Sequence, residues 1–266
     1  MTSAADVKKR NGEGIWSRTG FLLWQLVQRD LKSRFMGSIL GVSWAVVQPV
    51  SLVICYWFVF TKMIPRSTQA ATEGYVLFLI SGLVPWLGFA DALSRGTPSL
   101  VDNAPMVRKL TFQSEILVVT PCVTAMLFEL VGIVLFIIYQ VVIGASLWSL
   151  WILPFALLIQ LALQIGVSWI LSVLHVLFRD VMQVLGFALS LGLFLSPIFY
   201  SAEGKYEMFF QWNPMTPLLG LFRSALLGDP LPSVFSIVFL LVVVASVFTA
   251  GYVFIRRAQP NLADLL

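Results

Sequence analysis

Ionisable side chains within the long apolar runs are few, and they are the first candidates for chemistry. Glu129 is the one acid deep within such a run, and His175 is the only histidine of the chain. A charge in hydrocarbon is costly, so Glu129 is a functional candidate, with a neutral, hydrogen-bonded structural role as the alternative. A lone histidine excludes a multi-histidine metal site, and we expect His175 to be hydrogen-bonded near a helix end. The sequence contains neither a G-x-x-x-x-G-K-[ST] phosphate loop nor an H-E-x-x-H motif, so we predict no catalytic residue and no metal.

Aromatic side chains with a neighbouring amide form a second candidate site, one that would suit carbohydrate. Aromatic rings can stack on the C–H faces of sugars, while the sugar hydroxyls need partners such as Gln48. Phe187 and Phe194 are seven residues apart and would share one face of a helix. An interfacial aromatic belt or ordinary packing is the alternative for any one of these residues. The predicted lining residues of a passage are Trp44, Gln48, Tyr56, Phe187, Phe194 and Tyr200.

Basic residues precede the first apolar run, on a stretch with helical periodicity. We predict an interfacial helix on the cytoplasmic leaflet, in which Arg29, Lys32 and Arg34 attract the phosphate of a lipid carrier. The alternative is a plain basic flank that only sets topology. The net charge of +4 does not indicate nucleic-acid binding, because the basic residues are distributed among the predicted loops as in a membrane protein.

A polar stripe of glutamines and serines lies in the apolar run 147–178. Gln160, Gln164, Ser168 and Ser172 follow one another at a spacing of four residues. They share one helix face and can either line a passage or join helices by hydrogen bonds. Helix packing is the commoner use of such residues, and we favour it here.

The elements that position these residues are hydrophobic helices. The chain is 59% hydrophobic and 11% charged, whereas a soluble domain carries about 25% charged residues. Seven Lys or Arg precede the first apolar run and two separate it from the second, which predicts that both termini are cytoplasmic. The six predicted spans are 39–60, 75–93, 116–142, 147–178, 181–200 and 233–255.

The six spans predict an all-α polytopic membrane protein, whose segments follow one another in a simple order. A flexible cytoplasmic tail (1–16) precedes the amphipathic helix (17–37) and a single six-span domain (38–256), and a second tail (257–266) follows. Within the domain, residues 94–115 form a polar cytoplasmic segment. Residues 201–232 form an external segment, rich in proline and glycine yet apolar, that we expect to hold short re-entrant helices.

Several ordered stretches resemble one family. They are RDLKSRF at 29–35, LGVSWA at 40–45 with Gln48-Pro49, NAPMVRKLTFQSEI at 103–116, FRD at 178–180, SPIFY at 196–200, Asn213-Pro214 and Phe222-Arg223. Together they resemble the permease subunits of the ABC-2 polysaccharide exporters, which carry O-antigen, capsule or teichoic acid. The chain departs from the family pattern at Gln113, where proline is common, and in the shortness of residues 201–211.

The resemblance implies the channel-forming subunit of an exporter of lipid-linked polysaccharide in the bacterial inner membrane, with O-antigen favoured over capsule or teichoic acid. It implies a homodimer with two separate cytoplasmic ATPase subunits, which bind ATP and Mg, and a polyprenyl-pyrophosphate-type carrier. It also implies a gate at 201–232 and a coupling helix within 94–115. The segment 94–115 is the only sizeable cytoplasmic connection, and we expect Leu100, Val101, Asp102 and Asn103 to contact the ATPase.

Two other classes of protein remain as alternatives. A multi-pass enzyme acting on lipid-linked sugars would show clustered acids or paired histidines at one membrane face, and Asp91, Asp180 and His175 form only a weak cluster. An ion-coupled transporter would show internal repeats and several intramembrane ionisable groups, whereas one deep acid is present.

Overall fold

The computed structural model describes residues 4–36, 41–59, 69–108, 113–200 and 210–265. Every regular element in those ranges is a helix, which confirms the predicted all-α class. In chain order the elements are α1 (Ala4–Phe35), η1 (Gly41–Ser43), α2 (Trp44–Phe58), α3 (Gln69–Gly96), α4 (Ser99–Asp102), α5 (Ala104–Val107), α6 (Ser114–Val142), η3 (Trp148–Ile152), α7 (Leu153–Leu177), α8 (Val181–Leu195), α10 (Met215–Leu227) and α11 (Val234–Leu265).

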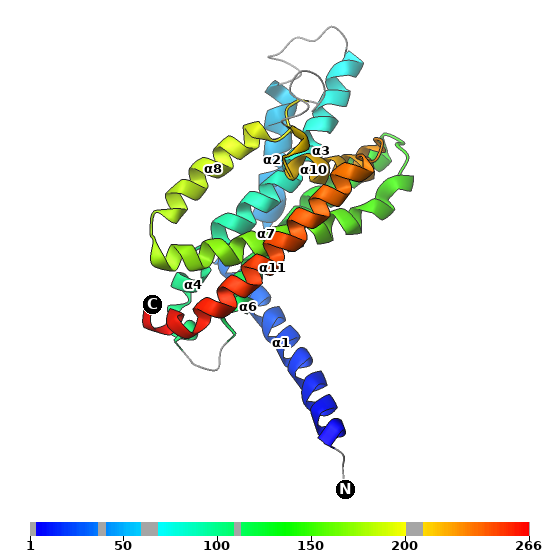
Figure 1. Ribbon diagram of the computed structural model, residues 1–266. Coiled ribbons are helices and arrows are strands. Elements are labelled where there is room, and N and C mark those ends of the chain that lie inside the picture. The colour runs from blue at the N-terminus through cyan, green and yellow to red at the C-terminus, as the bar shows by residue number, and fades with distance from the viewer. Residues whose placement is uncertain (1–3, 37–40, 60–68, 109–112, 201–209, 266) are drawn as a thin grey trace.

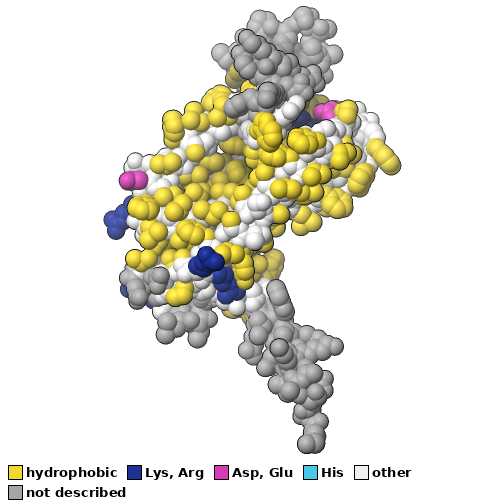
Figure 2. Space-filling view, in the orientation of Figure 1, with side chains coloured by type: hydrophobic (Ala, Val, Ile, Leu, Met, Phe, Trp, Pro, Cys, Tyr) yellow, Lys and Arg dark blue, Asp and Glu magenta, His cyan; other side chains and the backbone are white. Residues whose placement is uncertain are grey.

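Four long helices, α3, α6, α7 and α11, form the bundle that carries the core (Figure 1). The most extensive packing is between α7 and α11 and between α3 and α6, and the short α10 packs against α3, η3 and α7. Figure 2 shows hydrophobic side chains over the middle of one outer face, with charged ones toward its ends. Apolar surface around a polar-ended bundle is the distribution that a bilayer requires.

Glycine allows α7 and α11 to approach each other closely. A Cβ atom on Gly166 of α7 would lie 2.8 Å from the backbone of Phe248 on α11. A Cβ atom on Gly251 would in turn collide with the carbonyl oxygen of Gly166. Small residues at such a crossing let two apolar helices gain contact area where no hydrophobic effect drives them together.

Within the described residues, four helical stretches are long and apolar enough to span a membrane: Gly74–Gly96, Ser114–Val142, Trp148–Leu177 and Val234–Pro260. They coincide with the second, third, fourth and sixth predicted spans. The helices of the first and fifth predicted spans, α2 and α8, have 15 residues each. Such a helix rises only about 22 Å, less than the ~30 Å hydrocarbon core. The count of six spans and the orientation therefore stay predictions.

Both terminal helices are longer than expected. α1 begins at Ala4 and so includes residues 4–16, which we expected to form a flexible tail, and Figure 1 shows it projecting from one end of the bundle. At the other terminus, α11 continues past Arg257 to Leu265, and Leu262 is fully buried. The expected cytoplasmic tail 257–266 is therefore helical through Leu265 and packs on the bundle.

The two segments expected outside the spans each hold short helices. Within 94–115, α3 runs on to Gly96, and α4 and α5 follow as single helical turns. Within 201–232, α10 is a 13-residue apolar helix whose side chains are mostly buried. Residues 201–209 of that segment lie outside the described residues, so the predicted shape of the gate stays a prediction there.

Candidate functional site

The predicted lining residues of a passage face outward on their own helices. Trp44 and Gln48 are exposed on α2, and Phe187 and Phe194 are about two-thirds exposed on α8. Both helices pack on α3, and within this single chain they do not bring the two sets together. The side chain of Tyr56, also on α2, lies outside the described residues.

Tyr200 differs from the other lining candidates because its hydroxyl is engaged. It donates a hydrogen bond to the carbonyl oxygen of Phe194 at 2.5 Å, and the Phe194 ring stacks on Phe199 with centroids 5.7 Å apart. These contacts fold the chain back on the end of α8. Tyr200 therefore stabilises that helix end while keeping part of its ring exposed.

Two of the three predicted phosphate-binding residues have protein partners. Arg34 makes a two-pronged ion pair with Asp91 of α3, with nitrogen–oxygen distances of 2.9 and 3.4 Å, and stacks over the ring of Phe128. Arg29 donates to the side-chain oxygen of Asn103 at 2.8 Å. Lys32 is exposed on the same helix. The structure thus explains Arg29 and Arg34 at least partly as contacts between α1 and the bundle.

A second ion pair lies next to the first. Asp30 of α1 pairs with Arg95 of α3 at 2.5 Å, so an acid and an arginine four residues apart on each helix are matched in reverse order. Both pairs are about three-quarters buried at their side chains. In the sequence, Asp30 and Arg34 interrupt the apolar side of the predicted amphipathic helix. The structure explains both charges, because each pairs with an opposite charge on α3.

The four predicted coupling residues do not lie on one surface. Leu100 is completely buried in a cluster with α6 and α7. Val101 and Asp102 are exposed, and Asn103 both accepts from Arg29 and donates to the carbonyl oxygen of Ser99. Leu100 therefore anchors α4 to the bundle, and only Val101 and Asp102 offer side chains to a partner.

The far end of α11 supports the same segment, 94–115, which the sequence did not indicate. Arg256 forms an ion pair with Glu115 at 2.8 Å, and the Trp169 indole donates to the Glu115 carbonyl at 3.2 Å. Leu262 is buried in one cluster with Leu100. No local signal could have shown this, because Arg256 and Leu262 lie more than a hundred residues along the chain from Glu115 and Leu100, and only the folded bundle brings them together.

The polar stripe on α7 packs helices and does not line a passage. Gln160 donates to the Glu129 carboxylate at 2.5 Å and to the Pro85 carbonyl at 3.2 Å, and so joins α7 to α6 and α3. Gln164 donates to the Cys122 carbonyl at 3.1 Å. All four stripe residues and Glu129 are buried. Gly88 makes room for the Glu129 carboxylate, which would collide with any Cβ at that position.

Several oxygens in this seam still lack hydrogen-bond partners among the described residues. Glu129 Oε1 and the side-chain oxygens of Gln160 and Gln164 are buried without one. The expected hydrogen bond of His175 is likewise not seen at Nδ1, which is buried and unpaired in the described part of the chain. Unpaired buried acceptors are destabilising, so these oxygens reduce the stability that the seam contributes.

A buried arginine organises the end of α8. Arg223 of α10 donates to the carbonyl oxygen of Pro197 at 2.6 Å and lies 3.6 Å above the Phe78 ring centroid. Burial lowers the pKa of the guanidinium to about 10, and Asp229 acts in the opposite direction. Asn213 completes the junction by donating to the Leu195 carbonyl and accepting from the Met215 amide. Three of the family-like stretches therefore meet at one place.

Comparison with known proteins gives a consistent set of matches. A family model described as ABC-2 type transporter matches residues 21–227. The O-antigen export system permease protein RfbA of Myxococcus xanthus is 28% identical over 221 residues, which cover 79% of this chain and 82% of that protein. A protein of the same name from Klebsiella pneumoniae is 29% identical with the same coverage. The polysialic acid transport protein KpsM of Escherichia coli is 22% identical over 76% of this chain and 80% of its own length.

Proposed function

Because the chain belongs to the ABC-2 type transporter family, we propose that it is the channel-forming membrane subunit of an ATP-driven exporter of lipid-linked polysaccharide, with O-antigen as the cargo. The observation that carries this proposal is the match over residues 21–227, together with relatives that bear O-antigen export names. The chain works as a homodimer in the bacterial inner membrane, with both termini cytoplasmic. Two separate ATPase subunits bind ATP and Mg²⁺.

The exposed faces of α2 and α8 support a passage made by two copies. Neither face is covered within one chain, and each carries aromatic side chains that can stack on sugar rings. In a homodimer, the two α2 and two α8 helices enclose the glycan, and Gln48 supplies a hydrogen-bonding amide. Replacing Trp44 or Phe187 with alanine should lower glycan export, whereas Val238→Ala on the exposed face of α11 should not.

Energy coupling falls to the exposed turn of α4. Val101 and Asp102 present side chains, while Leu100, Arg29 and the end of α11 hold the segment in place. Val101→Asp should release or uncouple the ATPase with the membrane subunit still folded. Leu100→Asp serves as the contrast, because it places a charge in the core and should lower folding itself. Co-purification of an export-competent ATPase with Val101→Asp would exclude this surface.

The phosphate of the carrier is recognised beside α1. Arg29 and Lys32 are exposed, and Arg34 keeps part of its guanidinium accessible. Lys32→Ala should reduce export without changing the amount of folded dimer. Asp91→Ala separates two roles of Arg34, phosphate binding and attachment of α1 to α3. It leaves the arginine free to bind phosphate but removes its ion pair with α3.

The test of the overall function is deletion of the gene and complementation by the variants above. Loss of O-antigen from the cell surface, with the lipid-linked glycan accumulating on the cytoplasmic side, is the expected result. The similarity to the polysialic acid transport protein makes a capsular polysaccharide the second candidate cargo. Accumulation of capsular glycan in the deletion strain would favour that cargo, and unchanged export of both would overturn the function.

A further inference from the structure

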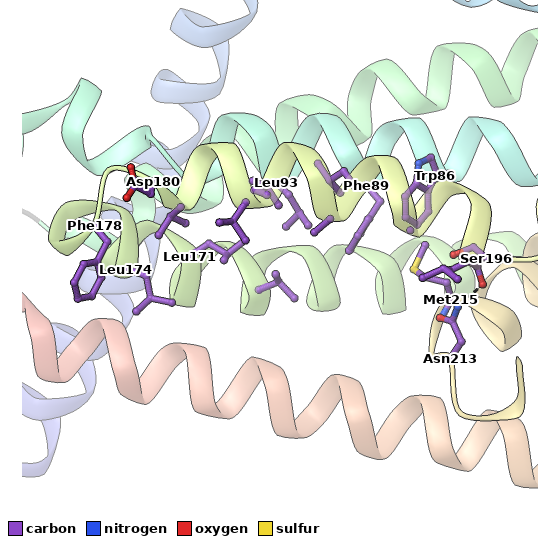
Figure 3. Close-up of a pocket in the computed structure, with 18 residues that line it drawn as sticks. Trp86, Phe89, Leu93, Leu171, Leu174, Phe178, Asp180, Ser196, Asn213 and Met215 are labelled. Carbon is purple, nitrogen blue, oxygen red and sulfur yellow. Dashed lines mark hydrogen bonds between the residues drawn. The ribbon is translucent and has the colours of Figure 1, made fainter. Parts of the chain in front are cut away.

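An apolar groove of about 800 Å³ separates α8 from α3 and α7 (Figure 3). Most of its lining comes from three helices and includes Phe89 on α3, Leu171 on α7 and Ala188 on α8. Met215 of α10 lies at one end. Polar lining residues lie only at its ends, Asp180 at one and Ser196 with Asn213 at the other. A cavity of this composition inside a membrane protein takes hydrocarbon.

The groove is narrow where α8 meets α3, which limits what can enter. At one end the tight turn between α7 and α8 closes it, with the Val181 amide bonded to the Phe178 carbonyl at 3.3 Å. Toward the other end α8 touches α3, and a Cβ on Gly192 would lie 2.6 Å from the Trp86 ring. A helix with its side chains is about 10 Å wide and cannot pass this close contact between α8 and α3. A single flexible hydrocarbon chain can enter sideways.

The charges at the turn match a zwitterionic headgroup. Arg179 and Asp180 are adjacent, both are exposed, and neither side chain has an ion-pair partner among the described residues. A phosphate accepts from a guanidinium, and a primary ammonium donates to a carboxylate. An anionic headgroup without an amine would leave Asp180 facing like charge. The opposite charges therefore favour a lipid that carries a phosphate and an amine together.

We propose that this groove binds one acyl chain of a phosphatidylethanolamine-type lipid, with the phosphate at Arg179 and the ammonium at Asp180. The chain occupies the part of the groove nearer the turn, beside Leu171 and Ala188, because a lipid of one leaflet reaches about half of the ~30 Å hydrocarbon core. The seated chain holds α8 at its distance from α3 and α7. This inference requires only that the chain lies in a bilayer, and it is independent of the exported glycan.

The test uses the full chain purified from membranes and reconstituted in nanodiscs of defined lipid. Bound lipid is quantified by native mass spectrometry after a detergent wash. Ala188→Phe fills the middle of the groove, whereas Ser190→Phe adds similar bulk to the opposite, exposed side of α8. We expect phosphatidylethanolamine to be retained by the wild type and by Ser190→Phe, and its retention to fall about tenfold in Ala188→Phe.

The headgroup assignment is tested with Arg179→Gln and Asp180→Asn. In mixed nanodiscs of phosphatidylethanolamine and phosphatidylglycerol, Asp180→Asn should remove the preference for the amine lipid, while Arg179→Gln should weaken retention of both. Because Ala188→Phe can misfold, Ala188→Leu is measured beside it, with thermal unfolding as the folding control. Equal retention by folded Ala188→Leu, Ala188→Phe and wild type would overturn the proposal. So would a disulfide between two copies through Val184→Cys, since it would place a second copy over the groove.

Discussion

At the scale of single residues, the buried carboxyl of Glu129 is explained by packing. Within the described residues its one hydrogen-bond partner is the Gln160 amide, and its second oxygen and the Gln160 oxygen are both unpaired. A buried carboxylate with so few partners is costly, and a neutral group of the same shape would satisfy the seam better. Glu129 therefore joins α6 to α7, and this role involves no proton transfer.

Glu129→Gln tests this reading directly. The new amide can still accept from Gln160 and can also donate to the unpaired Gln160 oxygen, so we expect export and thermal stability to be unchanged or higher. Glu129→Leu removes the acceptor and should lower the free energy of unfolding by about 1–3 kcal/mol. Both are measured by thermal unfolding of the purified protein and by surface glycan. A stable Glu129→Gln protein that fails to export would instead assign the carboxyl a functional charge.

At the scale of elements, two neighbouring ion pairs fasten α1 to α3. The two pairs, Asp30–Arg95 and Arg34–Asp91, fix the angle of α1, and the side chain of Arg29 extends the contact to Asn103. α1 precedes α2, which carries Trp44 and Gln48, so a change in α1 is expected to move the proposed passage. The same arginine can thus matter for export without touching the lipid carrier.

Exchanging the charges of one pair separates these roles. Arg34→Asp and Asp91→Arg should each lower export and stability, because each leaves two like charges facing across a partly buried contact. The double variant restores an ion pair, and we expect it to recover most of the stability, with a coupling free energy of about 1 kcal/mol in a double-mutant cycle. Recovery of stability without recovery of export would show that Arg34 also binds substrate.

The crossing of α7 and α11 makes a second prediction at this scale. Gly166→Ala places a methyl group 2.8 Å from backbone atoms of α11, which cannot move as a side chain would. We expect the free energy of unfolding to fall by about 1–3 kcal/mol. Gly186→Ala on α8 is the matched control, because nothing lies within 4 Å of its added methyl. Equal thermal unfolding of the two variants would mean that the helices separate easily.

At the scale of the whole molecule, the central claim is which end faces the cytoplasm. The α4 turn and the beginning of α11 belong to opposite sides of the membrane in the six-span order. Asp102 and Ser233 are exposed at those two places and serve as labelling positions. New cysteines are best introduced into a variant without Cys55, because Cys55 is exposed and would itself be labelled, whereas Cys122 is buried.

In a Cys55→Ser background, Ser233→Cys should react with an impermeant maleimide in intact cells. Asp102→Cys should react only after permeabilisation, because both termini and the α4 turn are expected on the cytoplasmic side. Cys122 stays in place, and because it is buried we expect no labelling of the Cys55→Ser protein without a new cysteine. Labelling of Asp102→Cys in intact cells would reverse the orientation and, with it, the assignment of the ATPase surface.

Much of the helical framework was predictable from local sequence. The second, third, fourth and sixth apolar runs became long helices, and α11 runs beyond the sixth to Leu265. An uninterrupted apolar run of that length has one stable form in lipid. The turn at 178–180 and the short helix in 201–232 were also marked, by adjacent charges and by proline and glycine. The family-like stretches carried the functional expectation, and the match over 21–227 confirmed the family.

What each polar residue does was decided by the tertiary structure. The sequence placed Leu100 on a docking face and the helix end after Arg257 in a tail, and both proved to pack in one buried cluster. It offered Arg34 to phosphate, but Asp91 lies 57 residues away in sequence and 2.9 Å away in space. Periodicity reports which face of a helix is apolar, and it carries no information on which distant group will lie opposite. Hydrogen bonds and ion pairs act over a few ångströms, so their partners are set only when the helices have packed.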